Sequence, residues 1–246
     1  MLTIQNLHKI WRENDITKAV FDGFSLTVTA GDFVGIVGPN GVGKSTLFNI
    51  IAGLDHDYQG QVFVDETSKY AVGYVFQNYR QSLFPWCTVF ENIAYPLKLR
   101  GKTISEQEEA VSILCKEFDI FINLSKYPYE LSGGQQQIVA ILRALIFKPD
   151  ILLLDEPFSA VDYDATYQII AFIQKVWKKT GITTLLISHD LDEVLLLCRR
   201  IVVLGGKPVS VKTDVPHRLE YPRNIDVMGN ESFVQTKRMI LRQIIK

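Results

Sequence analysis

Apolar and polar side chains alternate near the start of the chain and then give way to short, continuously apolar runs. The alternation over residues 3–7 and 24–29 predicts two half-buried antiparallel strands. The continuous runs are typical of strands buried on both faces of a sheet, and they cover residues 32–37, 72–76, 151–154 and 183–187. Because helical stretches flank the last two runs, the pattern predicts a mixed α/β fold that contains a parallel sheet.

Helical periodicity occupies several of the remaining segments. It predicts a helix from Lys44 that Gly53 closes, a helical stretch over residues 88–118, a helix after Ser132 and an amphipathic segment over residues 232–246. In the long stretch we expect Glu106, Glu108 and Glu109 to be exposed and Ile113, Leu114 and Phe118 to face inward. The apolar positions of the helix after Ser132 are Ile138, Ile141, Leu142 and Leu145. Those of the segment 232–246 are Phe233, Ile240, Leu241 and Ile244.

Composition narrows the class of protein. The 246 residues are 47% hydrophobic and 22% charged, with 26 basic against 27 acidic side chains, so no basic excess indicates a nucleic-acid partner. The apolar runs are far shorter than a bilayer span, and the first residues lack the pattern of a signal peptide. The three cysteines are scattered without metal-ligand spacing, which favours reduced thiols in a cytoplasmic protein. We therefore expect any membrane role to act through a partner.

A glycine-rich loop after the apolar run 32–37 carries the first chemical signal. It fits the phosphate-binding pattern of two glycines around four residues followed by lysine and serine, and it lies between a predicted strand and a predicted helix. Glycines allow backbone N–H groups to approach phosphate oxygens, the lysine supplies a positive charge, and the serine hydroxyl can ligate Mg²⁺. The loop comprises Gly38, Pro39, Asn40, Gly41, Val42, Gly43, Lys44, Ser45 and Thr46. It predicts binding of a nucleoside triphosphate.

Two adjacent acids, Asp155 and Glu156, end the apolar run 151–154. Burial of a carboxylate at a strand end is costly unless a positive charge lies nearby, and a magnesium–nucleotide complex would supply that charge. A second glycine motif precedes the acids by 24 positions: Leu131-Ser132-Gly133-Gly134-Gln135. Ser132 can cap a helix here, and the glycines leave the helix start open to an anion.

With both glycine motifs and the acid pair in this order, the chain resembles the ATP-binding subunits of ABC transporters over nearly its whole length. The resemblance implies an α/β P-loop cassette with a mixed core sheet flanked by helices, an antiparallel β lobe and a helical insertion. It also implies one domain over residues 1–246. Its expected parts are a core with the β lobe at about 1–85 and 150–220, an insertion at about 88–148 and an amphipathic tail at about 221–246.

The resemblance also implies roles for individual residues. Asp155 would organise Mg²⁺ together with Ser45 and Gln77, Glu156 would polarise the attacking water, and His189 would be the switch histidine at the γ-phosphate. Trp11 would stack on adenine, although it could equally anchor an edge strand. Ser132 to Gln135 would close over ATP held by the Lys44 of a second cassette, either the same chain or a paralogue. Asp162 would lie in the loop that communicates across this dimer.

For partners, the resemblance implies transmembrane permease subunits, a solute-binding protein that acts indirectly, and a location at the cytoplasmic face of the inner membrane. Phe84, Pro85 and Trp86 would contact the permease, or would form a local core of the helical insertion. This stretch and Tyr221-Pro222-Arg223 look most like importers of nitrate, sulfonates or taurine. Two departures from the family pattern are Ile138 and Cys198-Arg199-Arg200. The alternatives are another transport cargo, an exporter or lipid-trafficking cassette, and a soluble ABC ATPase.

Overall fold

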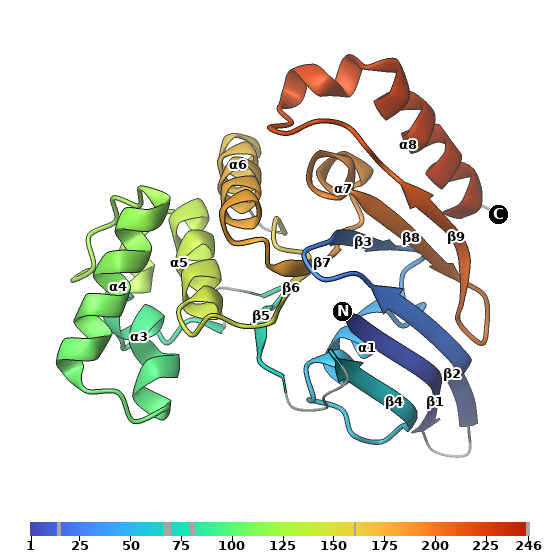
Figure 1. Cartoon of the computed structure of the whole chain (residues 1–246), viewed down its shortest axis with the longest axis horizontal. Helices are drawn as coiled ribbons and strands as arrows, with labels where there is room; N and C mark the ends of the chain where they lie inside the picture. The colour runs from blue at the N-terminus through green and yellow to red at the C-terminus, as the bar shows by residue number, and fades with distance from the viewer. Residues whose placement is uncertain (14–15, 66–69, 79–81, 160, 245–246) are drawn as a thin grey trace. The chain divides into compact units, whose positions relative to one another are not determined.

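The computed structural model describes residues 1–13, 16–65, 70–78, 82–159 and 161–244. Two compact units make up the chain. The first contains Met1–Tyr70 together with Gly181–Lys246, and the second contains Ala71–Thr180 (Figure 1). The predicted division into core, insertion and tail within one domain stays a prediction. No helix in the described ranges is long and apolar enough to cross a membrane.

An antiparallel sheet of order β2-β1-β4 lies in the first unit. Its strands are β1 (Leu2–Glu13), β2 (Ile16–Val28) and β4 (Gln59–Val64). Leu2 and Ile4 are buried two residues apart on β1, and a register shift after Ile4, where Asn6 has a φ of 49°, brings Leu7 to a buried position as well. The two predicted antiparallel strands are thus confirmed, but both are longer than expected, and the alternation pattern did not identify β4.

A second sheet in the same unit places β3 (Phe33–Val37) between β7 (Thr183–Ile187) and β8 (Arg200–Gly205), all parallel. The added strand β9 (Ser210–Pro216) runs antiparallel to β8. Every residue of β3 and β7 is buried, as the continuous apolar runs predict. Helices α1 (Lys44–Ile51), α7 (Leu191–Leu197) and α8 (Glu231–Ile244) belong to this unit, with α7 against β3 and α8 against β8.

In its described residues, the second unit combines two parallel strands with four α-helices. The strands are β5 (Val72–Val75) and β6 (Ile151–Asp155), and the helices are α3 (Val89–Leu99), α4 (Ile104–Phe118), α5 (Gly133–Leu145) and α6 (Tyr163–Thr180). The predicted helical stretch 88–118 is therefore two helices. Gly101 adopts a φ of 75° between them, and Thr103 starts α4 with a capping box.

Two predicted burial patterns need correction. The sequence predicts an inward-facing Ile113, but this side chain is 56% exposed. The buried face of α4 is set by Gln107, Val111 and Phe118, and a residue two positions after Val111 lies about 200° around the helix. In α8, Phe233 and Ile240 are buried as predicted, whereas Leu241 is exposed and Ile244 is half-buried.

A buried arginine fastens the segment before α8 to the end of α7. Arg223 is 2% exposed, and its guanidinium donates hydrogen bonds to the carbonyl oxygens of Leu195, Cys198, His217 and Leu219. Carbonyls at the end of a helix have no partner within the helix. The arginine therefore satisfies the end of α7 and fixes the tail at the same time.

His217 is part of this anchor and is neutral in the folded protein. Its Nε2 donates to the carbonyl oxygen of Leu195 at 3.0 Å. Burial, and then the positive charge of Arg223, lower the pKa of His217 to about 4. The unfolded chain has an ordinary histidine pKa of about 6.5, so between these values the unfolded state binds more protons.

We therefore expect the free energy of unfolding to decrease as the pH falls from about 6.5 towards 4. The contribution of His217 would be about 1 kcal/mol by pH 5 after allowance for partial solvent screening. Urea unfolding of the unmodified protein and of His217→Gln, each at pH 7.5 and pH 5, measures this contribution to the free energy of unfolding. The variant should lose less stability between the two pH values, and equal losses would contradict the assignment.

Candidate nucleotide-binding site

The phosphate loop lies between β3 and α1, as the sequence predicts. Gly38, Gly41 and Gly43 have φ values of 155°, 68° and 116°, which strongly favour glycine. A Cβ on Gly38 would lie 2.4 Å from the carbonyl oxygen of Leu204, and one on Gly43 would lie 2.9 Å from a methyl of Val20. Both glycines are thus required by backbone conformation and by close packing.

Lys44 is the first residue of α1, and its ammonium is turned back into the loop. The Nζ atom donates to the carbonyl oxygens of Gly38 at 2.9 Å and Pro39 at 3.0 Å, and the side chain is 8% exposed. Asn40, Gly41 and Ser45 are exposed beside it, Thr46 is half-buried and Val42 is buried. Phosphate binding is favoured here by a positive charge, by the start of a helix and by the backbone N–H groups of the loop.

The acid pair lies at the end of β6 in the second unit. Asp155 is 6% exposed and its Oδ2 accepts a hydrogen bond from the Tyr74 hydroxyl at 3.1 Å. Glu156 is half-buried, adopts a φ of 46° and accepts a bond from Gln77 Nε2 at 2.8 Å. The structure therefore brings Gln77 and Glu156 together. A left-handed conformation in a residue other than glycine is typical of functional positions.

The second glycine motif starts α5. Ser132 is the exposed N-cap residue; its Oγ accepts from the Gln135 N–H, and Gln135 Oε1 accepts from the Ser132 N–H. Gly133 follows as the first helical residue. Gly134, which we expect to leave the helix start open to an anion, is buried, and a Cβ there would lie 2.9 Å from the Cβ of Ala165 on α6. Its small size is needed where α5 and α6 pack together.

The remaining predicted residues lie at element ends. His189 is exposed just after β7, where Asp190 caps α7 by accepting a bond from the Asp192 N–H. Asp162 is exposed, and its Oδ1 accepts from the Ala165 N–H in the first turn of α6. Trp11 on β1 is 50% exposed, with Lys9 Nζ 4.9 Å from the ring centroid. Both proposed roles of Trp11, adenine stacking and strand anchoring, fit this exposure.

The predicted metal ligands offer the right atoms for Mg²⁺. Within the described parts of the chain, no three His, Cys, Asp or Glu side chains are grouped as a metal site. Ser45, Gln77 and Asp155 instead contribute hydroxyl, amide and carboxylate oxygens. Mg²⁺ prefers such oxygen ligands and is commonly held by one or two protein groups plus substrate phosphates. Ser45 lies in the first unit, and Gln77 and Asp155 lie in the second, and each carries an oxygen of the kind that Mg²⁺ accepts.

Two side chains at the site were not predicted. Tyr74, which bonds Asp155, lies in β5, and only the strand register shows that it shares a sheet face with that acid. Lys9 lies beneath Trp11, and its Nζ bonds Asp55 Oδ1 at 2.9 Å. The spacing of Lys9 and Trp11, two residues apart on one strand, is a signal that the sequence does contain.

The chain matches the family of ABC transporters over residues 21–159. It belongs to this family, as the two glycine motifs predict, and the α/β cassette fold is confirmed. It is 38% identical to an "Aliphatic sulfonates import ATP-binding protein SsuB" of Bacillus cereus, over 98% of this chain and 95% of that protein. It is 39% identical to the "Sulfate/thiosulfate import ATP-binding protein CysA" of Burkholderia mallei, over 91% of this chain and 65% of that protein.

A solved structure extends the comparison to the fold. The ATP-binding cassette MJ0796, described as a dimer in a post-hydrolysis state bound to ADP and Pi, has a TM-score of 0.75 and 28% identity. The similarity covers 89% of this chain and 100% of that one.

Proposed function

We propose that this protein is the ATP-hydrolysing subunit of an ABC importer for a small anion, with aliphatic sulfonates as the first candidate. The observation that carries the proposal is the phosphate loop, in which Lys44 is already turned inward at the start of α1. The acid pair and the capped start of α5 provide the further groups that hydrolysis between two cassettes needs. The whole-length similarity to an import ATP-binding protein supports the transport role.

In this proposal the chain's own residues divide the chemistry of hydrolysis. Lys44 and the loop N–H groups neutralise the β- and γ-phosphates, while Ser45, Gln77 and Asp155 hold Mg²⁺, which stabilises the charge that develops on the phosphoryl oxygens. Glu156 accepts a proton from the attacking water. Gln77 Nε2 donates a hydrogen bond to Glu156 Oε2 and so helps to orient the carboxylate. His189 contacts the γ-phosphate, and Trp11 stacks on the adenine.

A second cassette completes the proposed site. The capped start of α5 presents Ser132 and exposed N–H groups, which suit the γ-phosphate held by the loop of the other copy. Asp162, at the start of α6, would lie in the communicating loop. The dimeric state described for MJ0796 supports this arrangement.

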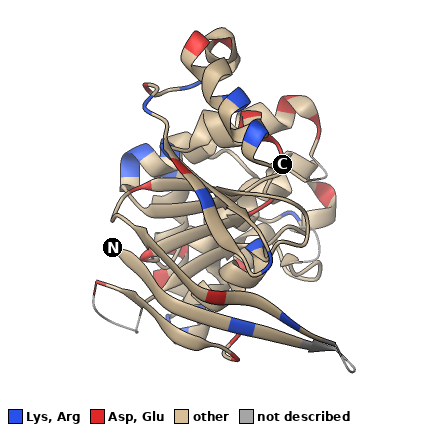
Figure 2. Cartoon of the chain, turned by 90° about the vertical axis from the view of Figure 1, so that its right-hand side faces the viewer, with Lys and Arg blue, Asp and Glu red and all other residues tan. Residues whose placement is uncertain are grey.

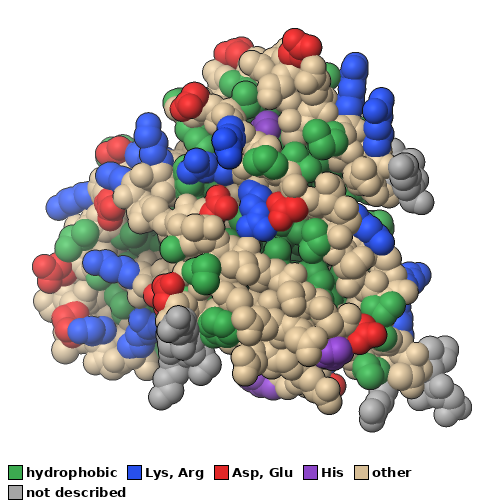
Figure 3. Space-filling view, turned by 45° about the vertical axis from the view of Figure 1, so that its right-hand side comes forward, with side chains coloured by type: hydrophobic (Ala, Val, Ile, Leu, Met, Phe, Trp, Pro, Cys, Tyr) green, Lys and Arg blue, Asp and Glu red, His purple; other side chains and the backbone are tan. Residues whose placement is uncertain are grey.

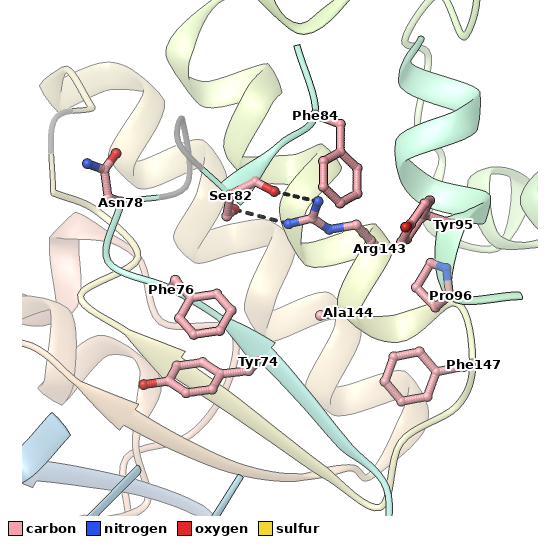
Figure 4. A pocket seen from close by; sticks show the side chains of 10 residues that line it. All are labelled: Tyr74, Phe76, Asn78, Ser82, Phe84, Tyr95, Pro96, Arg143, Ala144 and Phe147. Atoms are coloured by element: carbon pink, nitrogen blue, oxygen red, sulfur yellow. Dashed lines mark hydrogen bonds between the residues drawn. The ribbon is translucent and has the colours of Figure 1, made fainter. Parts of the chain in front are cut away.

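An aromatic groove in the second unit is the proposed docking surface for the permease. It has a volume of about 560 Å³ and is lined by Tyr74, Phe76, Asn78, Ser82, Phe84, Tyr95, Pro96, Arg143, Ala144 and Phe147 (Figure 4). Phe84 is half-buried against Tyr95, with ring centroids 4.7 Å apart, so it also belongs to the local core. Pro85 is exposed and Trp86 is 74% exposed beside it. A helix from the permease would cover these aromatic side chains.

The cargo is proposed by similarity rather than by a site on this chain. Relatives named for sulfonate and for sulfate or thiosulfate import are 38% and 39% identical to it. The sequence of the ATP-binding subunit therefore does not show which of these anions is transported. Selection would belong to the permease and to a solute-binding protein, with this chain at the cytoplasmic face of the membrane.

Charged side chains of both signs share the faces drawn in Figures 2 and 3. Acidic and basic side chains are interspersed along the strands and tail of the first unit (Figure 2). The space-filling view likewise places lysine, arginine and acidic side chains near one another (Figure 3). This mixed pattern differs from the basic stripe that a duplex-binding surface carries.

Glu156→Gln should preserve ATP binding but abolish most hydrolysis, because an amide cannot accept the proton from water. We expect a loss of at least about 100-fold in kcat, within the range of proton-transfer catalysis, and an ATP-dependent dimer. Phosphate release and light scattering after size exclusion measure the two effects. Hydrolysis at the rate of the unmodified protein would show that Glu156 is not the base.

Ser132 allows a matched test of the dimer in the Glu156→Gln background. Aspartate and asparagine both cap helices well, but only aspartate adds a negative charge where the γ-phosphate of the other copy would lie. Ser132→Asp should keep the ATP-loaded protein monomeric, whereas Ser132→Asn should retain most of the dimer. Gly134 is unsuitable for this purpose because its replacement would disturb the packing of α5 on α6. Dimers of equal stability in both variants would contradict the arrangement.

Trp86→Ala should weaken capture of the permease from detergent-solubilised membranes at least several-fold, since buried aromatic side chains dominate interfaces. Phe121→Ala is the matched control, because Phe121 is a 94% exposed aromatic residue of the same unit outside the groove. Quantitative mass spectrometry of the co-purified chains provides the measurement. Equal loss with both variants, or no loss with Trp86→Ala, would exclude Trp86 from the interface.

A further inference from the structure

Tyr74 links the aromatic groove to the acid pair within the second unit. Its ring lines the groove and stacks on Phe76, with centroids 4.1 Å apart and an interplanar angle of 19°. Its hydroxyl lies at the other end of the side chain and donates to Asp155 Oδ2 at 3.1 Å. Figure 4 shows the two stacked rings beside the groove, with the Tyr74 hydroxyl pointing away from the other lining residues.

The strand register explains this connection. Parallel pairing of β5 with β6 places Tyr74 beside Leu153. Because side chains alternate along a strand, Asp155 points to the same face as Leu153, two residues or about 6.6 Å further along. A tyrosine side chain that leans along the strand covers this distance, whereas a shorter hydroxyl residue would not.

The chemistry of the bond is that of a neutral donor and a charged acceptor. Burial, and then the charge of Asp155, raise the pKa of the Tyr74 hydroxyl far above its usual range, so the phenol keeps its proton. A hydrogen bond to a charged group is stronger than one between neutral groups. The bond is made to Oδ2 and restricts the rotation of the carboxylate.

We infer that Tyr74 is a positioning residue that orients the Asp155 carboxylate and couples it to the permease segment that we propose to occupy the groove. Phe76 is 41% exposed and stacked on Tyr74. A permease segment that covers Phe76 would therefore contact a ring that is stacked on Tyr74, whose hydroxyl bonds Asp155. The inference rests on the proposed function, because Asp155 matters to hydrolysis only as a magnesium-organising group.

Tyr74→Phe isolates the hydroxyl, since it keeps the ring, the stacking on Phe76 and the groove wall. We expect the Mg²⁺ concentration for half-maximal ATPase activity to rise three- to tenfold, because the carboxylate is no longer held in place. ATP affinity without metal should stay within twofold of the unmodified protein. Tyr70→Phe is the matched control, because that hydroxyl donates a similar bond at 2.8 Å to a backbone carbonyl, the one of Ile51.

A binding measurement separates this effect from turnover. In the Glu156→Gln background, electron paramagnetic resonance of Mn²⁺ with saturating ATP gives the metal dissociation constant directly. Tyr74→Phe should weaken Mn²⁺ binding three- to tenfold and Tyr70→Phe by less than twofold. An unchanged constant, or tighter binding, would overturn the positioning role.

The proposed coupling between the groove and Asp155 is tested with the permease in detergent. The permease should stimulate hydrolysis by the unmodified protein, and Tyr74→Phe should reduce the fold stimulation at saturating Mg²⁺ by at least half while the permease still co-purifies. Full stimulation would overturn the coupling. Failure of the unmodified protein to hydrolyse ATP would instead refute the proposed function, so the two failures are distinguishable.

Discussion

The hydrogen bonds from the Lys44 ammonium to the carbonyl oxygens of Gly38 and Pro39 are the interaction on which the phosphate loop depends. A nearly buried cation would be costly without them. They replace part of its lost hydration and curl the backbone around it, so that a bound phosphate would meet a charge already in place. Such preorganisation requires a loop without side chains at its closest approaches, and the packing of Gly38 on Leu204 and of Gly43 on Val20 meets that condition.

Asp155 and Glu156 are preorganised in a similar way. Each of the two carboxylates accepts a hydrogen bond from a neutral donor that lies on β5 or just beyond its end. Tyr74 holds Asp155, and Gln77 holds Glu156. Neutral donors orient an acid without cancelling its charge. A lysine or arginine in their place would neutralise the acids and lower their basicity. The end of β5 is therefore suited to positioning rather than to charge compensation.

Most of the parallel strands and the chemical motifs could be predicted from sequence because they are local: apolar runs, glycine loops and caps. Long-range features could not. The prediction of a buried Ile113 is wrong because apolar spacing alone does not show which face of α4 meets the rest of the unit. The packing of Gly134 against Ala165 could not be predicted either, because it depends on the position of α6. Tyr74 had no sequence signal of its own, because its partner lies 81 positions away and only the strand register joins them.

Register and packing also account for the departure at Cys198-Arg199-Arg200. Cys198 is fully buried, and a Cβ added to Gly35 would lie 3.1 Å from its sulfur, so the small strand residue and the thiol fit each other. The Cys198 carbonyl is one that Arg223 binds. Arg200 forms a bidentate pair with Asp214 on β9 and donates to the carbonyl oxygen of Thr27 on β2. The segment thus joins β8 to its neighbouring strands and to the tail. Since α7 separates this segment from His189 along the chain, the departure leaves the predicted switch histidine itself unchanged.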